Sequence, residues 1–184
     1  GHRLPFRIVD AFAPAPFSGN PAGVVLPTPE GPRLEELPTP LLQAVAAELN
    51  LSETAFPHPP DAQGVRRLRW FTPTTEVTLC GHATLAAAHA LVEAGAELPL
   101  HFASLSGPLA AEAEGPGRLR LDFPADPPRE EAPPEGLLEA LGIPAGTPTR
   151  FATGARCALL ALEAEDRGVL GALAPDMRAL GQVR

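Results

Sequence analysis

The sequence lacks two residue types altogether, and each absence removes a class of chemistry. No lysine occurs among the 184 residues, so all 14 basic residues are arginine. Without a lysine amine there is no group for a Schiff base, for attachment of pyridoxal phosphate or for the phosphate contact of a Walker motif. Tyrosine is also absent, which excludes a phenol as acid or base. Proton transfer would have to use aspartate, glutamate, one of five histidines or one of two cysteines.

Cysteine is scarce and basic charge is dispersed. Cys80 and Cys157 are too few for a disulfide scaffold, which favours a reducing, cytoplasmic location. The net charge is −8, and outside a short arginine cluster at residues 66–69 the basic residues are scattered, so nucleic acid is not an expected partner. The start of the chain has no signal-peptide pattern and no apolar run reaches membrane length, so no membrane association is expected.

Hydrophobic residues make up 45% of the chain, enough for one domain of ordinary size or two small ones. Strands are predicted at 7–12, 24–26, 51–56, 65–71, 77–80, 118–123 and 156–162, and a pair of strands at 100–114. Helices are predicted at 39–50, 81–93, 137–141 and around 170–180. Two similar strand openings, "RIVDAF" and "RLRLDFPA", suggest a first domain at 3–117 and a second at 118–184. The Pro-rich segment at 124–136 is the strongest compositional boundary between them.

The predicted helix from Gly81 to Glu93 is apolar on every side between His82 and Val92. A helix of this kind is buried all round, as it would be if a sheet wrapped around it. Its first turn offers free N–H groups and the positive end of the helix dipole. A carboxylate or phosphate could bind there, since Gly81 has no side chain to block it and His82 and Thr84 could add hydrogen bonds. The alternative is that Gly81 only makes a turn and His82 only caps the helix.

Cys80 immediately precedes this helix and allows two interpretations. A helix N-terminus can lower the pKa of a thiol and produce a thiolate base. Alternatively, Cys80 is a small buried apolar residue at the end of a strand. A metal site is not predicted, because Cys-x-His is not a usual zinc-binding spacing and no second ligand pair stands out. His89, on the same face of the helix as His82, is expected to be a packed or surface imidazole.

Glu53 lies in "LSETAF", where alternation places Leu51, Glu53 and Ala55 on one face of the predicted strand. A carboxyl group flanked by apolar side chains is desolvated, which is a condition for proton transfer near neutral pH. The alternative is an exposed glutamate on the wet face of a sheet.

Three stretches resemble the phenazine-biosynthesis PhzF-like isomerases in order and spacing. They are "VDAFAPAPFSGNPAGVVL" at 9–26, "LNLSETAFP" at 49–57 and "RWFTPTTEVTLCGHATLAAAHAL" at 69–91. The resemblance implies an α+β, diaminopimelate epimerase-like fold of two similar domains, each with a sheet wrapped around a central buried helix. It also implies a reaction that takes place in the cleft between the two domains and uses no cofactor. An example is a proton shift on a dihydro-hydroxyanthranilate-type acid.

The resemblance also implies roles for individual residues. Glu53 would be the catalytic proton shuttle, and Asn20 would line the cleft in its "GNP" turn. The substrate would be held at the helix start by Gly81, His82, Ala83 and Thr84. Cys80 stands where related epimerases carry a catalytic thiol, so it is an alternative base. Those epimerases need a second cysteine from the other domain. Cys157 is instead expected in a core strand and gives no sign of being that second thiol.

These observations together predict a cofactor-independent isomerase that moves a proton on a small carboxylate-bearing metabolite. The resemblance also implies an acidic residue and a Gly-rich turn in the second domain, and the chain ends before either of them. We therefore expect an incomplete second domain, little activity from this chain alone, and a homodimer. Two alternatives remain open, namely a two-base amino-acid racemase or epimerase using Cys80, and a non-catalytic remnant that binds small acids.

Overall fold

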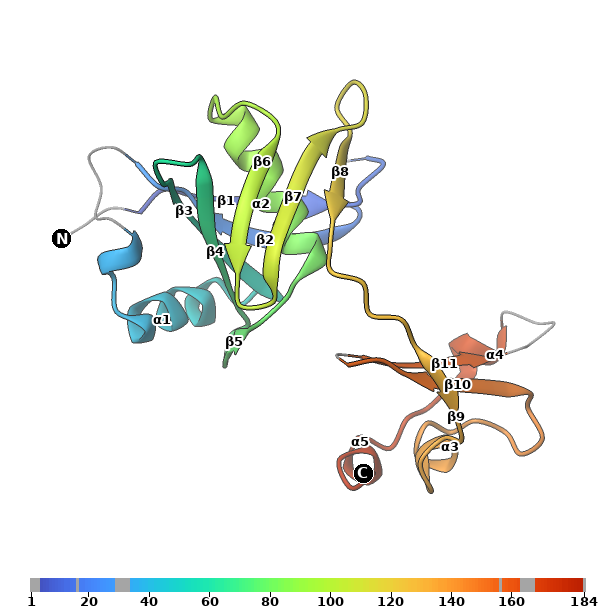
Figure 1. Ribbon diagram of the computed structural model, residues 1–184. Helices are drawn as coiled ribbons and strands as arrows, with labels where there is room; N and C mark the ends of the chain where they lie inside the picture. The colour runs from blue at the N-terminus through green and yellow to red at the C-terminus, as the bar shows by residue number, and fades with distance from the viewer. Residues whose placement is uncertain (1–3, 16, 29–33, 156, 163–167, 184) are drawn as a thin grey trace. The chain divides into compact units, whose positions relative to one another are not determined.

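Figure 1 shows the computed structural model of the chain, which describes residues 4–15, 17–28, 34–155, 157–162 and 168–183. The chain divides into two units, Gly1–Pro124 and Ala125–Arg184. The division falls at the start of the Pro-rich segment and not at 117/118, where the sequence suggests the second domain begins. The reason is that strand β8 (Leu119–Asp122) pairs with β7 (Gly107–Ala113) and so completes the first sheet.

The first unit is built on one eight-stranded sheet. Its other strands are β1 (Phe6–Ala11), β2 (Asn20–Val25), β3 (Glu53–Pro60), β4 (Val65–Phe71), β5 (Glu76–Val77) and β6 (Leu100–Ser104). The spatial order is β1-β2-β3-β4-β6-β7-β8, and β5 pairs with β4 outside this path. Neighbouring strands are antiparallel except for two parallel pairs, β2–β3 and β4–β6. Parallel neighbours need a crossover connection, and helices α1 (Thr39–Leu49) and α2 (Gly81–Glu93) lie within these two crossovers.

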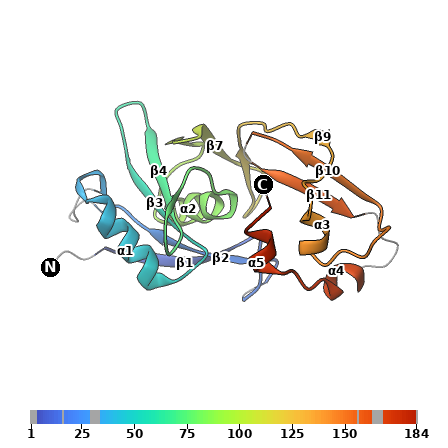
Figure 2. The same ribbon diagram turned by 90° about the horizontal axis from the view of Figure 1, so that it is seen from below.

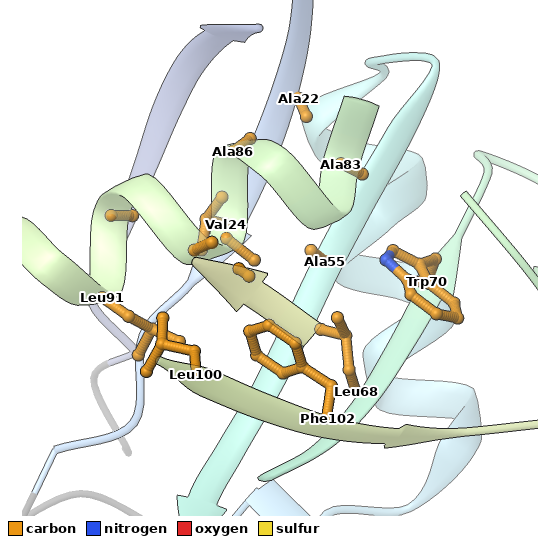
Figure 3. Packing of buried hydrophobic residues seen from close by; sticks show 14 of the residues in the cluster. Ala22, Val24, Ala55, Leu68, Trp70, Ala83, Ala86, Leu91, Leu100 and Phe102 are labelled. Atoms are coloured by element: carbon orange, nitrogen blue, oxygen red, sulfur yellow. The ribbon is translucent and has the colours of Figure 1, made fainter. Parts of the chain in front are cut away.

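Helix α2 lies inside the curve of this sheet, where Figure 2 shows it between β1 and β2 on one side and β4 and β7 on the other. Seven of its 13 residues are buried, and five of these are alanines. Small side chains let the surrounding strands approach the helix closely, and Figure 3 shows Ala83 and Ala86 packed among side chains from the sheet. The predicted bounds of this helix are confirmed, and Gly95 follows it with a φ of 94° that favours glycine.

Helix α1 covers the other face of the sheet, over a second apolar cluster. The cluster includes Leu42 and Ala46 from α1, together with Phe56 and Phe71 from the strands. Pro38 occupies the capping position of α1, and the Thr39 hydroxyl accepts a hydrogen bond from Arg69. The 3-10 helix η1 (Leu34–Glu36) packs nearby against β3.

Three strands of the first unit differ clearly from the prediction, and β2 is one of them because it begins at Asn20 and not at residue 24. β3 begins at Glu53 and continues through "PHPP", which the sequence suggests is a loop. The prolines are accommodated because the pairing with β4 shifts register between Pro57 and Pro60, where a missing N–H donor does little harm. β5 is only two residues long, so Leu79 and Cys80 lie outside the strand predicted at 77–80.

The second unit contains a three-stranded antiparallel sheet in the order β11-β10-β9. Its strands are β9 (Arg129–Glu131), β10 (Thr149–Thr153) and β11 (Ala158–Leu162), and its helices are α3 (Leu137–Ala140), α4 (Gly168–Ala172) and α5 (Met177–Leu180). The single final helix predicted around 170–180 is therefore two short helices, and Asp176 caps the second by accepting hydrogen bonds from two backbone N–H groups. Arg156, the first residue of the strand predicted at 156–162, lies outside the described residues.

Cys157 does not occupy the core position expected for it. It is exposed and precedes β11, so it is not a core-strand residue. Over the described parts of the chain, no helix combines the length and apolar character needed to cross a membrane.

Candidate active site

Glu53 and His82 come together where β3 begins and α2 begins. The Nε2 atom of His82 lies 3.4 Å from Oε2 of Glu53. The side chains are 11% exposed for His82 and 21% for Glu53, so both are largely shielded yet still reachable from solvent. Ala55, on the same face of β3 as Glu53, packs in the core around α2. The face predicted for Glu53 by strand alternation is therefore the face that meets the helix.

Ser52 is a member of this group that the sequence analysis does not identify. Its Oγ atom lies 3.1 Å from Nε2 of His82 and donates a 3.4 Å hydrogen bond to the carbonyl of Pro21. Strand alternation assigns Ser52 to the face opposite Glu53, but β3 begins only at Glu53, so alternation does not apply to the residue before it. The adjacent hydroxyl and carboxylate in "SET" were the only sequence signal for this contact.

Cys80 completes the group from the side of the helix. It is buried and free, and its Sγ atom lies 3.5 Å from Nδ1 of His82. Burial, together with the nearby Glu53 carboxylate, raises the pKa of the Cys80 thiol to about 11, against the opposing effect of the backbone N–H groups of Ala83 and His82. The interpretation of Cys80 as a thiolate with a lowered pKa is therefore wrong, since desolvation outweighs the helix N-terminus.

The start of α2 has the open space that the sequence predicts at Gly81. A side chain at Gly81 would meet no atom within 4 Å, so a ligand could approach the backbone there. Ala83 and Thr84 differ, because both are fully buried. The hydroxyl of Thr84 donates a 2.5 Å hydrogen bond to the carbonyl of Cys80. It therefore fixes the first turn of the helix, and it does not face a ligand as the resemblance implies.

Asn20 is exposed and opens β2, next to β3. The parallel register pairs Ala22 with Glu53, so Asn20 lies beyond Glu53 at the same end of the two strands. This placement brings the "GNP" turn to the edge of the group formed by Glu53 and His82, and the contact from Ser52 to Pro21 links the two.

The donor atoms of Glu53, Cys80 and His82 lie within 4.8 Å of one another, which raises the question of a metal ion. A single ion would need one imidazole nitrogen to face both of the other ligands at about 2.0–2.3 Å from the metal. His82 instead presents Nδ1 to the thiol and Nε2 to the carboxylate. The arrangement fits a chain of hydrogen bonds better than a metal chelate.

A separate open groove of about 930 Å³ runs beside the middle of α2 and does not include Glu53 or His82. Val9, Leu85, His89 and Arg118 are among the residues that line it. His89 is exposed and lies 3.4 Å from Glu93, which agrees with its expected role as a surface imidazole.

Several known proteins are similar to this chain. A family model described as phenazine biosynthesis-like protein matches residues 9–183. An uncharacterized isomerase from Pseudomonas aeruginosa is 53% identical over 137 residues, which cover 73% of this chain and 49% of that protein. An uncharacterized isomerase from Halalkalibacterium halodurans is 49% identical over 144 residues, which cover 76% of this chain and 51% of that protein. The chain thus spans about half the length of these two curated relatives.

Solved structures agree with the sequence matches. A PhzF-family phenazine biosynthesis protein from Enterococcus faecalis superposes with a TM-score of 0.77 at 38% identity, covering 98% of this chain and 65% of that one. A phenazine biosynthesis PhzC/PhzF protein from Clostridium difficile gives a TM-score of 0.73 at 32% identity, covering 96% and 63%. The α+β fold, with a sheet curved around α2, is therefore the fold of these proteins.

Proposed function

Since this chain belongs to the phenazine biosynthesis-like protein family, we propose that it is an isomerase that moves a proton on a small carboxylate-bearing metabolite without a cofactor. The observation that carries the proposal is the contact between Glu53 and His82 at the start of a buried helix, 3.4 Å from carboxylate oxygen to imidazole nitrogen. A carboxylate shielded from water, beside a hydrogen-bond donor and an open helix end, has the parts that proton transfer requires.

In this proposal Glu53 is the acid and base. Its carboxylate removes a proton from an acidic C–H bond of the substrate, and the electron pair of that bond moves into the conjugated system next to the substrate carboxylate. The same proton, now on Glu53, is returned to a different carbon of the substrate. Glu53 is largely shielded but still reachable from solvent, so part of the transferred proton exchanges with water before it is returned. General acid–base catalysis of this kind contributes about 10²–10⁴-fold to the rate.

The substrate carboxylate is proposed to bind at the N-terminus of α2. The helix dipole and the backbone N–H of Gly81 favour an anion there, and Gly81 leaves space for it. Asn20 is proposed to contact the substrate from the adjacent end of β2, and His82 to orient both the substrate and Glu53.

The test follows deuterium uptake in heavy water. A dihydro-hydroxyanthranilate-type acid and a panel of small unsaturated carboxylic acids are incubated with this chain, and in parallel with the full-length P. aeruginosa relative. Deuterium at carbon is measured by mass spectrometry. We expect Glu53→Gln to lower the exchange rate by at least about 10²-fold, while Glu48→Gln, at an exposed site on α1, leaves it unchanged. Exchange that persists in Glu53→Gln would contradict the role of Glu53.

The same experiment separates the alternatives. Exchange by the relative but not by this chain would support the expectation that this chain alone has little activity. Binding of an acid without exchange by either protein would support a non-catalytic binder. The two-base racemase is disfavoured by the raised pKa of the Cys80 thiol. We also propose that the protein forms a homodimer.

A further inference from the structure

We propose that Cys80 is a positioning residue, which fixes His82 in the tautomer that carries its proton on Nε2 by donating its S–H to Nδ1. The catalytic consequence of this inference rests on the proposed function, but the hydrogen bond and the tautomer do not. The buried thiol then acts neither as a base nor as an inert apolar residue.

The geometry holds the thiol on one side of the imidazole ring. Cys80 precedes α2 with an extended backbone, at φ −148° and ψ 117°. Its carbonyl accepts hydrogen bonds from the backbone N–H of Thr84, at 3.3 Å, and from the Thr84 hydroxyl, at 2.5 Å. With this residue held at the helix start, Sγ lies 3.5 Å from Nδ1, within the range of a sulfur hydrogen bond. The opposite nitrogen, Nε2, faces Glu53 and Ser52.

Counting protons leaves two arrangements for a neutral imidazole. In the first, the thiol donates to Nδ1 and the proton on Nε2 is donated to the ionised carboxylate of Glu53. In the second, the ring proton is on Nδ1 and is donated to sulfur, and the thiol proton turns toward Glu53. Because Nε2 then carries no proton, its lone pair faces a carboxylate oxygen 3.4 Å away. Two acceptors then face each other, with only the Ser52 hydroxyl available to donate to Nε2.

The first arrangement is favoured because no two acceptors face each other in it and the Ser52 hydroxyl can still donate to the Pro21 carbonyl. It requires the thiol to keep its proton, and burial together with the Glu53 carboxylate does keep it, since the pKa is raised to about 11. Which nitrogen of a histidine carries the proton is set by the hydrogen bond that the other nitrogen makes. Cys80 therefore sets the direction of the hydrogen bond from His82 to Glu53, which orients the Glu53 carboxylate.

The experiment measures the tautomer directly. The chain is labelled with ¹⁵N-histidine and the two ring nitrogens of His82 are recorded by NMR at about pH 8, where an ordinary imidazole is neutral. In the unchanged protein we expect Nδ1 to resonate as an unprotonated nitrogen and Nε2 as a protonated one. Cys80→Ala should shift the population toward the Nδ1–H tautomer, and Cys80→Ser should restore the original pattern, because a hydroxyl can also donate. Cys157→Ala, at the exposed cysteine, is the matched control and should change nothing.

The outcomes are decisive in both directions. A protonated Nδ1 in the unchanged protein, or a His82 tautomer unaffected by Cys80→Ala in a variant whose amide spectrum shows an intact fold, would overturn the inference. Once a substrate is known, Cys80→Ala should lower kcat about tenfold with little change in KM, and Cys80→Ser should recover it. Failure to find any isomerase activity would count against the proposed function and leave the NMR result to decide the tautomer.

Discussion

At the scale of single residues, burial makes the two cysteines chemically different. Cys80 is 8% exposed and its thiol has a pKa raised to about 11 by desolvation. Cys157 is exposed and precedes β11 in the second unit. Because the thiolate is the reactive form of cysteine, an electrophile should distinguish the two sites.

We predict that iodoacetamide at pH 8 alkylates Cys157 rapidly and leaves Cys80 unmodified while the protein is folded. Peptide mass spectrometry after a time course measures both sites, and addition of denaturant should expose Cys80 to the reagent. Fast labelling of Cys80 in the folded chain would instead favour a thiolate and the two-base mechanism.

His58 is the second residue whose environment sets its chemistry. It is buried on β3, and its Nδ1 lies 3.8 Å from Oε2 of Glu35. Burial, with smaller contributions from Arg67 and Arg69, lowers the pKa of His58 from 6.5 to about 4, while Glu35 opposes this effect. The folded protein thus keeps His58 neutral at a pH where the unfolded chain would protonate it.

The sign of the pH effect follows from proton binding. Between about pH 6.5 and pH 4 the unfolded chain binds more protons at His58 than the folded chain does, so acid favours unfolding. The contribution of His58 is fully present above pH 6.5, and we predict a loss on the order of 3 kcal/mol across this window. Urea unfolding at several pH values measures it. His58→Gln should flatten the curve, and His101→Gln, at an exposed histidine of β6, should not.

At the scale of elements, α2 depends on small side chains. Ala83, Ala86 and Ala87 are completely buried within the curve of the sheet. A core packed to this density has no space for additional methylene groups without displacing strands or distorting rotamers.

We predict that Ala87→Leu lowers the free energy of unfolding by about 1–3 kcal/mol. Ala47→Leu makes the same change at an exposed position of α1 and should alter stability by no more than about 0.5 kcal/mol. Chemical denaturation of both variants gives the comparison. Equal effects would mean that α2 is not packed as tightly as the structure indicates.

At the scale of the whole molecule, the two units differ greatly in core size. The first unit contains both apolar clusters. In the second unit the buried apolar residues among those described are only Ala140, Ile143, Phe151 and Ala152. A unit of this size with so small a core is only marginally stable by itself.

We therefore predict that a fragment ending at Pro124 unfolds cooperatively, at a temperature close to that of the main transition of the intact chain. A fragment beginning at Ala125 should give the circular dichroism of a largely unfolded chain. A cooperative melt from the second fragment would show that its few core residues are sufficient.

The open edge of the first sheet bears on the proposed homodimer. β1 is the end strand of the described sheet, and its side chains Phe6 and Ile8 are 52% and 58% exposed. Exposed apolar edge strands pair readily with other chains. We predict that Ile8→Lys weakens self-association in sedimentation experiments, whereas Leu105→Lys, at an exposed apolar position away from this edge, does not.

The sequence by itself determined the elements whose pattern is local. The apolar run from Gly81 to Glu93 gave the bounds of α2 because a fully buried helix needs apolar residues on every side. Alternation gave the face that Glu53 shares with Ala55. These features depend on neighbours in the chain, so they can be read without knowing what packs against them.

Only the tertiary structure decided the features that depend on contacts between distant segments. Strand pairing placed β8 in the first sheet, and a register shift extended β3 through its prolines. The contacts of His82 with Ser52 and Glu53 join residues about 30 positions apart. Protonation of Cys80 was decided by the competition between the helix N-terminus and desolvation, and desolvation prevails because the folded chain buries the sulfur beside a carboxylate.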